Sequence, residues 1–115
     1  MRPLELALQY MDIVFRGKNM DALRPLFASD FTFKGPLYEF DTAEGYIQSL
    51  ASDPLEGFDY QIIRAFEEES SACLVYQFSK PGVSVPMAQL FEIREDKISK
   101  ILLVFDTGAF LPSSL

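Results

Sequence analysis

Hydrophobic and polar positions in the first half of the chain predict three helices and a strand. From Leu4 to Arg16 the polar side chains form one narrow stripe at helical spacing, which indicates a helix covered on most of its sides. Gly17 is expected to end this helix in a left-handed conformation. Residues 19–27 predict a second helix, which Pro25 should kink or end early. The alternation of Phe31–Lys34 predicts a strand, broken by the Gly and Pro that follow.

Polar residues mark where the second and third helices begin. Asn19 or Asp21 could cap the second helix. The third is expected within residues 40–52, where Asp41 and Glu44 have the spacing of a capping box. Its buried face would comprise Tyr46, Ile47, Leu50 and Ala51.

The second half of the chain predicts strands. Turn signals at residues 67–71, 80–82 and 94–97 separate apolar runs at 58–66, 72–79, 83–93 and 98–105. Such short loops favour an antiparallel meander. Helices grouped before an antiparallel sheet indicate an α+β fold with the helices on one face, in one domain spanning residues 1–115.

The last expected strand is apolar on both of its faces. Residues 101–105 read ILLVF, whereas a strand with one face in water should alternate apolar and polar residues. Leaving Leu102 and Val104 exposed would forfeit about 1.5 to 3 kcal/mol each. We therefore expect a homodimer through the outer sheet face. The alternative cover is the C-terminal tail, residues 110–115, folded back over its own sheet.

Composition and charge narrow the possible partners. The chain has 115 residues and a net charge of −7, which disfavours binding to nucleic acid or to an anionic membrane surface. It shows neither a secretory leader pattern nor a long apolar run, so we expect a cytoplasmic protein. Cys73 is expected to be an inert buried thiol. There is no histidine, which excludes Ser-His and Cys-His nucleophiles and most zinc catalysis, and we expect no metal and no cofactor.

Two segments resemble a known superfamily. Residues 10–36, YMDIVFRGKNMDALRPLFASDFTFKGP, and residues 86–106, PMAQLFEIREDKISKILLVFD, resemble the nuclear transport factor 2-like superfamily and, within it, the SnoaL-like and ketosteroid isomerase group. The resemblance implies a cystatin-like α+β fold: a strongly bent sheet forming a cone-shaped half barrel, about three helices on its concave side, and a pocket between them. Members include isomerases, cyclases, epoxide hydrolases, dehydratases and binding modules, so the fold alone leaves the function open.

The resemblance also suggests site residues. Tyr10 matches the tyrosine that donates to the substrate oxygen in steroid isomerases of this group. The group's proton-shuttling Asp is replaced by Gly35, and its oxyanion-hole acid by Gln89, an amide that can donate a hydrogen bond but does not titrate. Steroid isomerase activity is therefore not expected. Alternatively, Tyr10 is a core aromatic bonded to a backbone carbonyl, and Gln89 is satisfied by the sheet edge or by water.

Asp106 follows the last strand. SnoaL-like cyclases use an Asp from this part of the chain as an acid or base, but Asp106 could equally be a turn cap or a solvated strand end. An epoxide hydrolase of the limonene type needs a buried Asp-Arg-Asp set, and Arg64 has no matching pair of carboxylates. The expected ligand-binding residues are Phe15, Phe31, Phe33, Tyr38, Tyr60, Phe91, Leu103 and Phe105.

Two functions follow from these features. The first is a noncatalytic protein that binds a hydrophobic small molecule or serves as a dimeric association module, which the missing base and acid favour. The alternative is an isomerase, cyclase or dehydratase that transfers a proton on an apolar carbonyl compound, with Tyr10, Gln89 and Asp106 as its catalytic residues.

Overall fold

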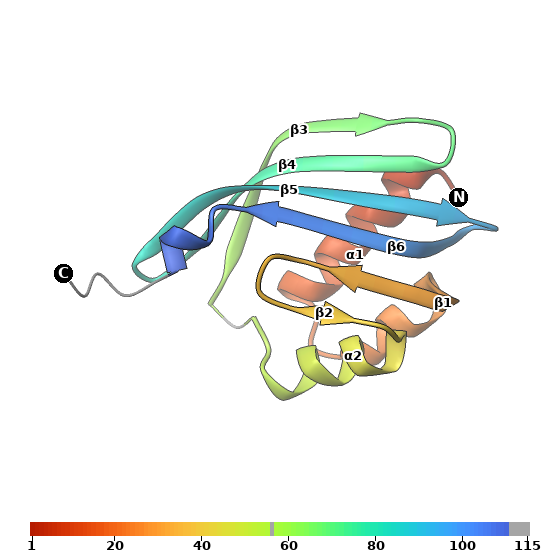
Figure 1. Cartoon of the computed structure of the whole chain (residues 1–115), viewed down its shortest axis with the longest axis horizontal. Helices are drawn as coiled ribbons and strands as arrows, with labels where there is room; N and C mark the ends of the chain where they lie inside the picture. The colour runs from red at the N-terminus through yellow and green to blue at the C-terminus, as the bar shows by residue number, and fades with distance from the viewer. Residues whose placement is uncertain (56, 111–115) are drawn as a thin grey trace.

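The computed structural model describes residues 1–55 and 57–110 (Figure 1). Helix α1 is followed by the 3-10 helix η1, two strands, α2, four strands and η2. The bounds are α1 Pro3–Arg16, η1 Met20–Leu26, β1 Phe27–Lys34, β2 Glu39–Phe40, α2 Ala43–Ser52, β3 Asp59–Glu67, β4 Ser71–Lys80, β5 Val83–Arg94, β6 Lys97–Phe105 and η2 Thr107–Phe110.

The strands form one bent, open sheet in the order β2-β1-β6-β5-β4-β3. The expected antiparallel meander of β3 to β6 is confirmed. The sheet is nevertheless mixed, because β1 pairs with β6 in parallel, with Phe33 opposite Ile101. The short strand β2 was not expected. Register shifts in the β3–β4 and β5–β6 pairs mark irregularities, which increase the bend of a sheet. The α+β prediction with a cone-shaped sheet is thus confirmed.

The helices cover the concave face. Figure 1 shows α1 crossing behind the sheet, where it packs on β3, β4 and β5, while α2 packs on β1 and η1. The second helix is a 3-10 helix, which Asn19 caps by accepting a hydrogen bond from the Asp21 amide. The core is rich in aromatics: Phe31 and Phe91 are fully buried, and Phe27 stacks on Phe31 with 4.0 Å between ring centroids.

Two expected caps differ in the structure. Gly17 ends α1 in an extended conformation, with φ −76° and ψ 156°, so the left-handed prediction is wrong. Glycine fits there for another reason, because a Cβ would lie 2.5 Å from the carbonyl oxygen of Ile13. At α2 the cap is Thr42, whose hydroxyl accepts from the Gly45 amide at 3.0 Å, rather than Asp41.

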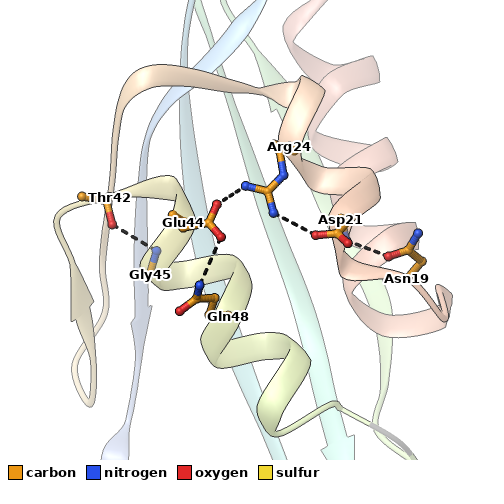
Figure 2. Close-up of polar contacts among 7 residues, drawn as sticks. All are labelled: Asn19, Asp21, Arg24, Thr42, Glu44, Gly45 and Gln48. Carbon is orange, nitrogen blue, oxygen red and sulfur yellow. Dashed lines mark hydrogen bonds and ion pairs between the residues drawn. The ribbon is translucent and has the colours of Figure 1, made fainter.

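Glu44 does not complete a capping box, because it joins α2 to η1 (Figure 2). Its carboxylate binds Arg24, which also binds Asp21 at 2.8 Å, and it accepts a hydrogen bond from Gln48 at 3.2 Å. The hydrogen bond from Arg24 lowers the pKa of Glu44. Exposed pairs of this kind contribute little to stability, because water screens them. Their role is to fix α2 beside η1 at one edge of the cone.

The outer face of the sheet carries apolar side chains that no described element covers. Phe66, Leu102 and Val104 are 56%, 36% and 55% exposed. Cys73 lies between Phe66 and Leu90 in the strand register and is only partly buried, so the prediction of a buried thiol is wrong. The alternative cover, the tail, falls mainly on residues 111–115, which lie outside the described residues. None of the described helices is long and apolar enough to cross a membrane.

Candidate functional site

A cavity of about 330 Å³ lies between the concave face of the sheet and the helices. Aromatic and aliphatic side chains from α1, α2 and five strands form most of its wall. The principal apolar lining residues are Val14, Phe15, Phe33, Phe40, Leu50, Leu55, Phe58, Phe78, Met87, Leu103, Phe105 and Phe110. The volume falls at the lower end of the range for small-molecule sites, about 300 to 1,000 Å³.

Four buried polar side chains come together in the cavity wall. The hydroxyls of Tyr10 and Tyr46 form a hydrogen bond, and the Tyr76 hydroxyl donates to Oε1 of Gln89 at 2.7 Å. Each of the four is at most 6% exposed, and all four line the cavity. We call them the Tyr–Gln cluster. The residues come from α1, α2, β4 and β5, so only the tertiary fold assembles the cluster.

Burial further disfavours ionisation of the three phenols, which are neutral at pH 7 even at their ordinary pKa of about 10. It raises the pKa of Tyr10 to about 12, although hydrogen bonds with Tyr46 and Gln89 partly oppose this effect. Burial also raises the pKa values of Tyr46 and Tyr76. At neutral pH every hydroxyl of the cluster therefore carries a hydrogen that it can donate.

The mouth of the cavity differs from its interior. The turn of residues 35–38 forms one side of it, and Tyr38 is 64% exposed. Phe110 of η2 forms another side and packs on Phe78 and Phe105. The charged lining residues are Lys80 and Asp53. Figure 1 shows β4 and β5 curling over at the end of the sheet that carries η2.

The expected site residues divide between cavity and core. Tyr10, Gln89, Phe15, Phe33, Tyr38, Leu103 and Phe105 line the cavity. Phe31 and Phe91 are instead fully buried in the core, where Phe31 lies beside Tyr46 of α2 and Phe91 packs edge-on to Tyr10 of α1, with 5.2 Å between the ring centroids of Phe91 and Tyr10. Tyr60 packs on Phe15, with 4.8 Å between their ring centroids, but it is not among the described lining residues. The Arg16 guanidinium lies over the Tyr60 ring.

Asp106 is not among the lining residues. Its side chain is exposed, and its carboxylate accepts a hydrogen bond from the Gly108 amide at 2.9 Å. This geometry matches the turn-cap alternative. The guanidinium of Arg64 is likewise directed to the carbonyl of Ile63, on an exposed part of β3.

Sequence reasoning did not identify Tyr46, Tyr76 and Lys80 as site residues. Tyr46 was expected only as a buried helix residue, and Tyr76 lay in a predicted strand without an assigned role. Lys80 belongs to a Lys-Pro-Gly pattern, which was interpreted only as a turn between two strands. A search for tyrosines at inward strand positions could have found Tyr76, whereas the contact of Tyr46 with Tyr10 depends on tertiary packing.

The lining groups can hold a polar oxygen but offer little for proton transfer. The carboxylate among the described lining residues is Asp53, which is exposed at the mouth. Gly35 lies at the position where the isomerase pattern has its base, and its amide donates to the Tyr38 carbonyl at 2.8 Å. Within the described ranges, no three His, Cys, Asp or Glu residues cluster so as to hold a metal ion.

A larger hollow of about 690 Å³ lies outside this cavity, between the end of α1 and the segment after α2. It shares Val14, Phe15, Leu50 and Leu55 with the cavity, and its remaining lining is largely made of loop residues such as Lys18 and Asn19. No buried polar group of the Tyr–Gln cluster faces it. The smaller cavity is therefore the better candidate site.

Comparisons with known proteins agree with this architecture. The family model of the SnoaL-like domain matches residues 7–101. No curated protein matches the sequence. An NTF2-like protein of unknown function from Cytophaga hutchinsonii is similar in structure, with a TM-score of 0.81, 22% sequence identity, and coverage of 96% of this chain and 95% of that one.

Two further solved structures carry names of enzymes. A candidate ketosteroid isomerase from Kribbella flavida has a TM-score of 0.76 at 14% identity, covering 89% of this chain and 76% of its own. A LEH-like epoxide hydrolase from M. tuberculosis has a TM-score of 0.75 at 11% identity, covering 93% and 84%. At these identities the likeness shows a shared fold.

Proposed function

The chain belongs to the SnoaL-like domain family of the NTF2-like superfamily, and from its cavity we propose that it binds an apolar small molecule bearing a carbonyl or similar oxygen. The observation that carries this proposal is the Tyr–Gln cluster, a set of buried hydrogen-bond donors in an otherwise apolar cavity. Sites for small molecules commonly combine an apolar wall with a few convergent polar groups.

The donors of the cluster outnumber the hydrogen bonds within it. Each hydroxyl carries one donor hydrogen and the Gln89 amide carries two. The interactions of Tyr10 with Tyr46, Tyr10 with Gln89, and Tyr76 with Gln89 do not use all of them. The cluster is therefore matched to a ligand that accepts hydrogen bonds. A carbonyl or ether oxygen meets this need without bringing a second donor into the apolar cavity.

The volume limits the size of the buried part of the ligand. Water takes about 30 Å³ per molecule, so the cavity has room for on the order of a dozen non-hydrogen atoms. This suits a molecule of one or two rings, with any further groups extending through the mouth.

A noncatalytic role fits these residues better than an enzymatic one. The Tyr–Gln cluster could polarise a carbonyl, but a proton transfer also needs a base, and the described interior lining has no carboxylate. The alternative, an isomerase, cyclase or dehydratase, draws support from neighbours named as isomerase and hydrolase. Under this alternative Tyr10→Phe lowers turnover of a ketone substrate by about ten-fold to a thousand-fold, which a rate measurement would show.

The first prediction concerns the Tyr10 hydroxyl. In Tyr10→Phe, the affinity for 2-acetylnaphthalene is expected to fall by about two-fold to ten-fold, because one neutral hydrogen bond to the ketone is lost. Isothermal titration calorimetry measures this change. The matched ligand is 2-ethylnaphthalene, which lacks the oxygen and should bind both proteins equally. An equal loss for both ligands would mean that the substitution distorts the cavity and that the hydroxyl does not recognise the oxygen.

We propose in addition that the protein is a homodimer through the outer sheet face. Phe66, Leu102 and Val104 form an exposed apolar surface over β3 and β6, connected in the register by half-buried residues of β4 and β5. When this surface packs against the same surface of a second copy across a two-fold axis, apolar groups contact apolar groups and leave the solvent.

A second prediction tests the dimer. Val104→Arg should weaken self-association by about ten-fold to a hundred-fold, because a charge would be buried without a partner. Multi-angle light scattering over a dilution series gives the mass. Lys34→Arg, on the neighbouring strand β1, is the control that should leave the mass unchanged. A wild-type monomer at high micromolar concentration would refute the dimer.

A further inference from the structure

The mouth of the cavity holds a cation in an unusual setting. Lys80 is the last residue of β4, and its side chain is half-buried in the cavity wall. Its ammonium lies over two aromatic rings, 5.3 Å from the centroid of Phe58 and 5.1 Å from that of Phe110. The rings hold the charge beside the opening and leave it accessible to a group at the mouth.

Lys80 forms no ion pair with the described carboxylates, whereas several other cations of the chain do. The other charged lining residue, Asp53, ends α2 and is exposed. Water screens an exposed charge more strongly than a half-buried one. Lys80 is therefore the less screened of the two charges that line the described cavity, although the chain as a whole carries a charge of −7.

The two ends of the cavity thus have different chemistry. The interior offers neutral donors from the Tyr–Gln cluster, and the mouth offers a cation beside aromatic rings. On the basis of the proposed function, we infer that the ligand is an apolar carboxylic acid whose inner end bears the accepting oxygen and whose carboxylate stays at the mouth beside Lys80. The ring faces of Phe58 and Phe110 would contact the apolar part next to the carboxylate.

The test compares two probes of the same shape. They are 6-acetyl-2-naphthoic acid and 6-acetyl-2-naphthamide, which share the ketone and differ in the charge at the other end. The wild-type protein is expected to bind the acid about three-fold to ten-fold more tightly than the amide, because only the acid forms a partly exposed ion pair with Lys80. This ratio should fall as ionic strength rises.

Lys80→Met removes the charge and keeps an apolar side chain between the two rings. We expect it to reduce the acid-to-amide ratio to about one while amide affinity stays within about two-fold of wild type. Lys18→Met is the control, because it changes the net charge equally from a position outside the described cavity lining. It should keep the wild-type ratio.

The outcomes separate the inference from the proposed function. If the amide binds as tightly as the acid to the wild-type protein, the inference about Lys80 is wrong and the proposed function stands. If Lys80→Met weakens acid and amide alike, Lys80 only supports the aromatic rings and the inference is again wrong. If neither probe binds the wild-type protein, both the inference and the proposed function fail.

Discussion

Leu103→Trp is expected to abolish binding of 2-acetylnaphthalene, with a loss of affinity of at least about a hundred-fold. Leu103 lines the cavity and pairs with Gln89 across the β5–β6 ladder, so an indole at this position occupies the space beside the Tyr–Gln cluster. A ligand cannot enter a space that a side chain already fills. The folded state should persist. Overpacking a filled core lowers the free energy of unfolding by about 1 to 3 kcal/mol, and enlarging a residue that borders a cavity lowers it by less.

The chain contains no tryptophan, so the substitution also introduces a single fluorescent reporter. Its emission should be shifted to the blue, as expected for an indole removed from water. Leu8→Trp is the matched control, since Leu8 is 37% exposed on α1 and lies outside the described cavity lining. Calorimetric titration of both variants checks the prediction. Full binding by folded Leu103→Trp would mean that the ligand site lies elsewhere.

Gln89→Leu should lower the free energy of unfolding by about 1 to 3 kcal/mol. The change leaves the Tyr76 hydroxyl buried without its acceptor and removes an interaction of Tyr10. A buried polar group that loses its hydrogen-bond partner destabilises the folded state by more free energy than the hydrogen bond had contributed net. Urea denaturation followed by circular dichroism measures the difference between variant and wild type.

The double variant Gln89→Leu with Tyr76→Phe provides the control. Removing both partners of a buried hydrogen bond is often nearly neutral, so the pair should cost less than the sum of the two single changes. Strict additivity would show that the bond between Tyr76 and Gln89 contributes nothing in solution. The network could then not be the preorganised donor set on which the proposed function depends.

Local patterns were sufficient for most of the fold. The polar stripe of residues 4–16 predicted α1, and turn signals predicted β3 to β6 almost to their ends, because periodicity and turn chemistry are properties of neighbouring residues. The parallel pairing of β1 with β6 joins residues far apart in sequence, such as Phe33 and Ile101, and no local pattern encodes it. The cap of α2 was misassigned because Asp41 and Thr42 are both good capping residues one position apart.

The site was harder to predict, because it too depends on contacts between residues far apart in sequence. Strand alternation identifies inward residues, but α1 fills part of the concave face, so inward Phe91 belongs to the core while inward Leu103 borders the cavity. Tyr10 and Gln89 were suggested by family resemblance. The partner of Tyr10, Tyr46, is 36 residues away and meets it only in the folded chain.

The most direct test of the cavity as a ligand site is a titration of protein labelled with ¹³C at the methionine methyl groups. The chain has four methionines, and Met87 lines the cavity, whereas Met20 borders the larger outer hollow and Met11 is fully buried in the core. On addition of 2-acetylnaphthalene, the Met87 signal should move in a saturable way, because the aromatic ring of the ligand lies beside it, and the other three should change little. A saturable shift of Met20 alone, or no saturable shift of Met87, would contradict the account.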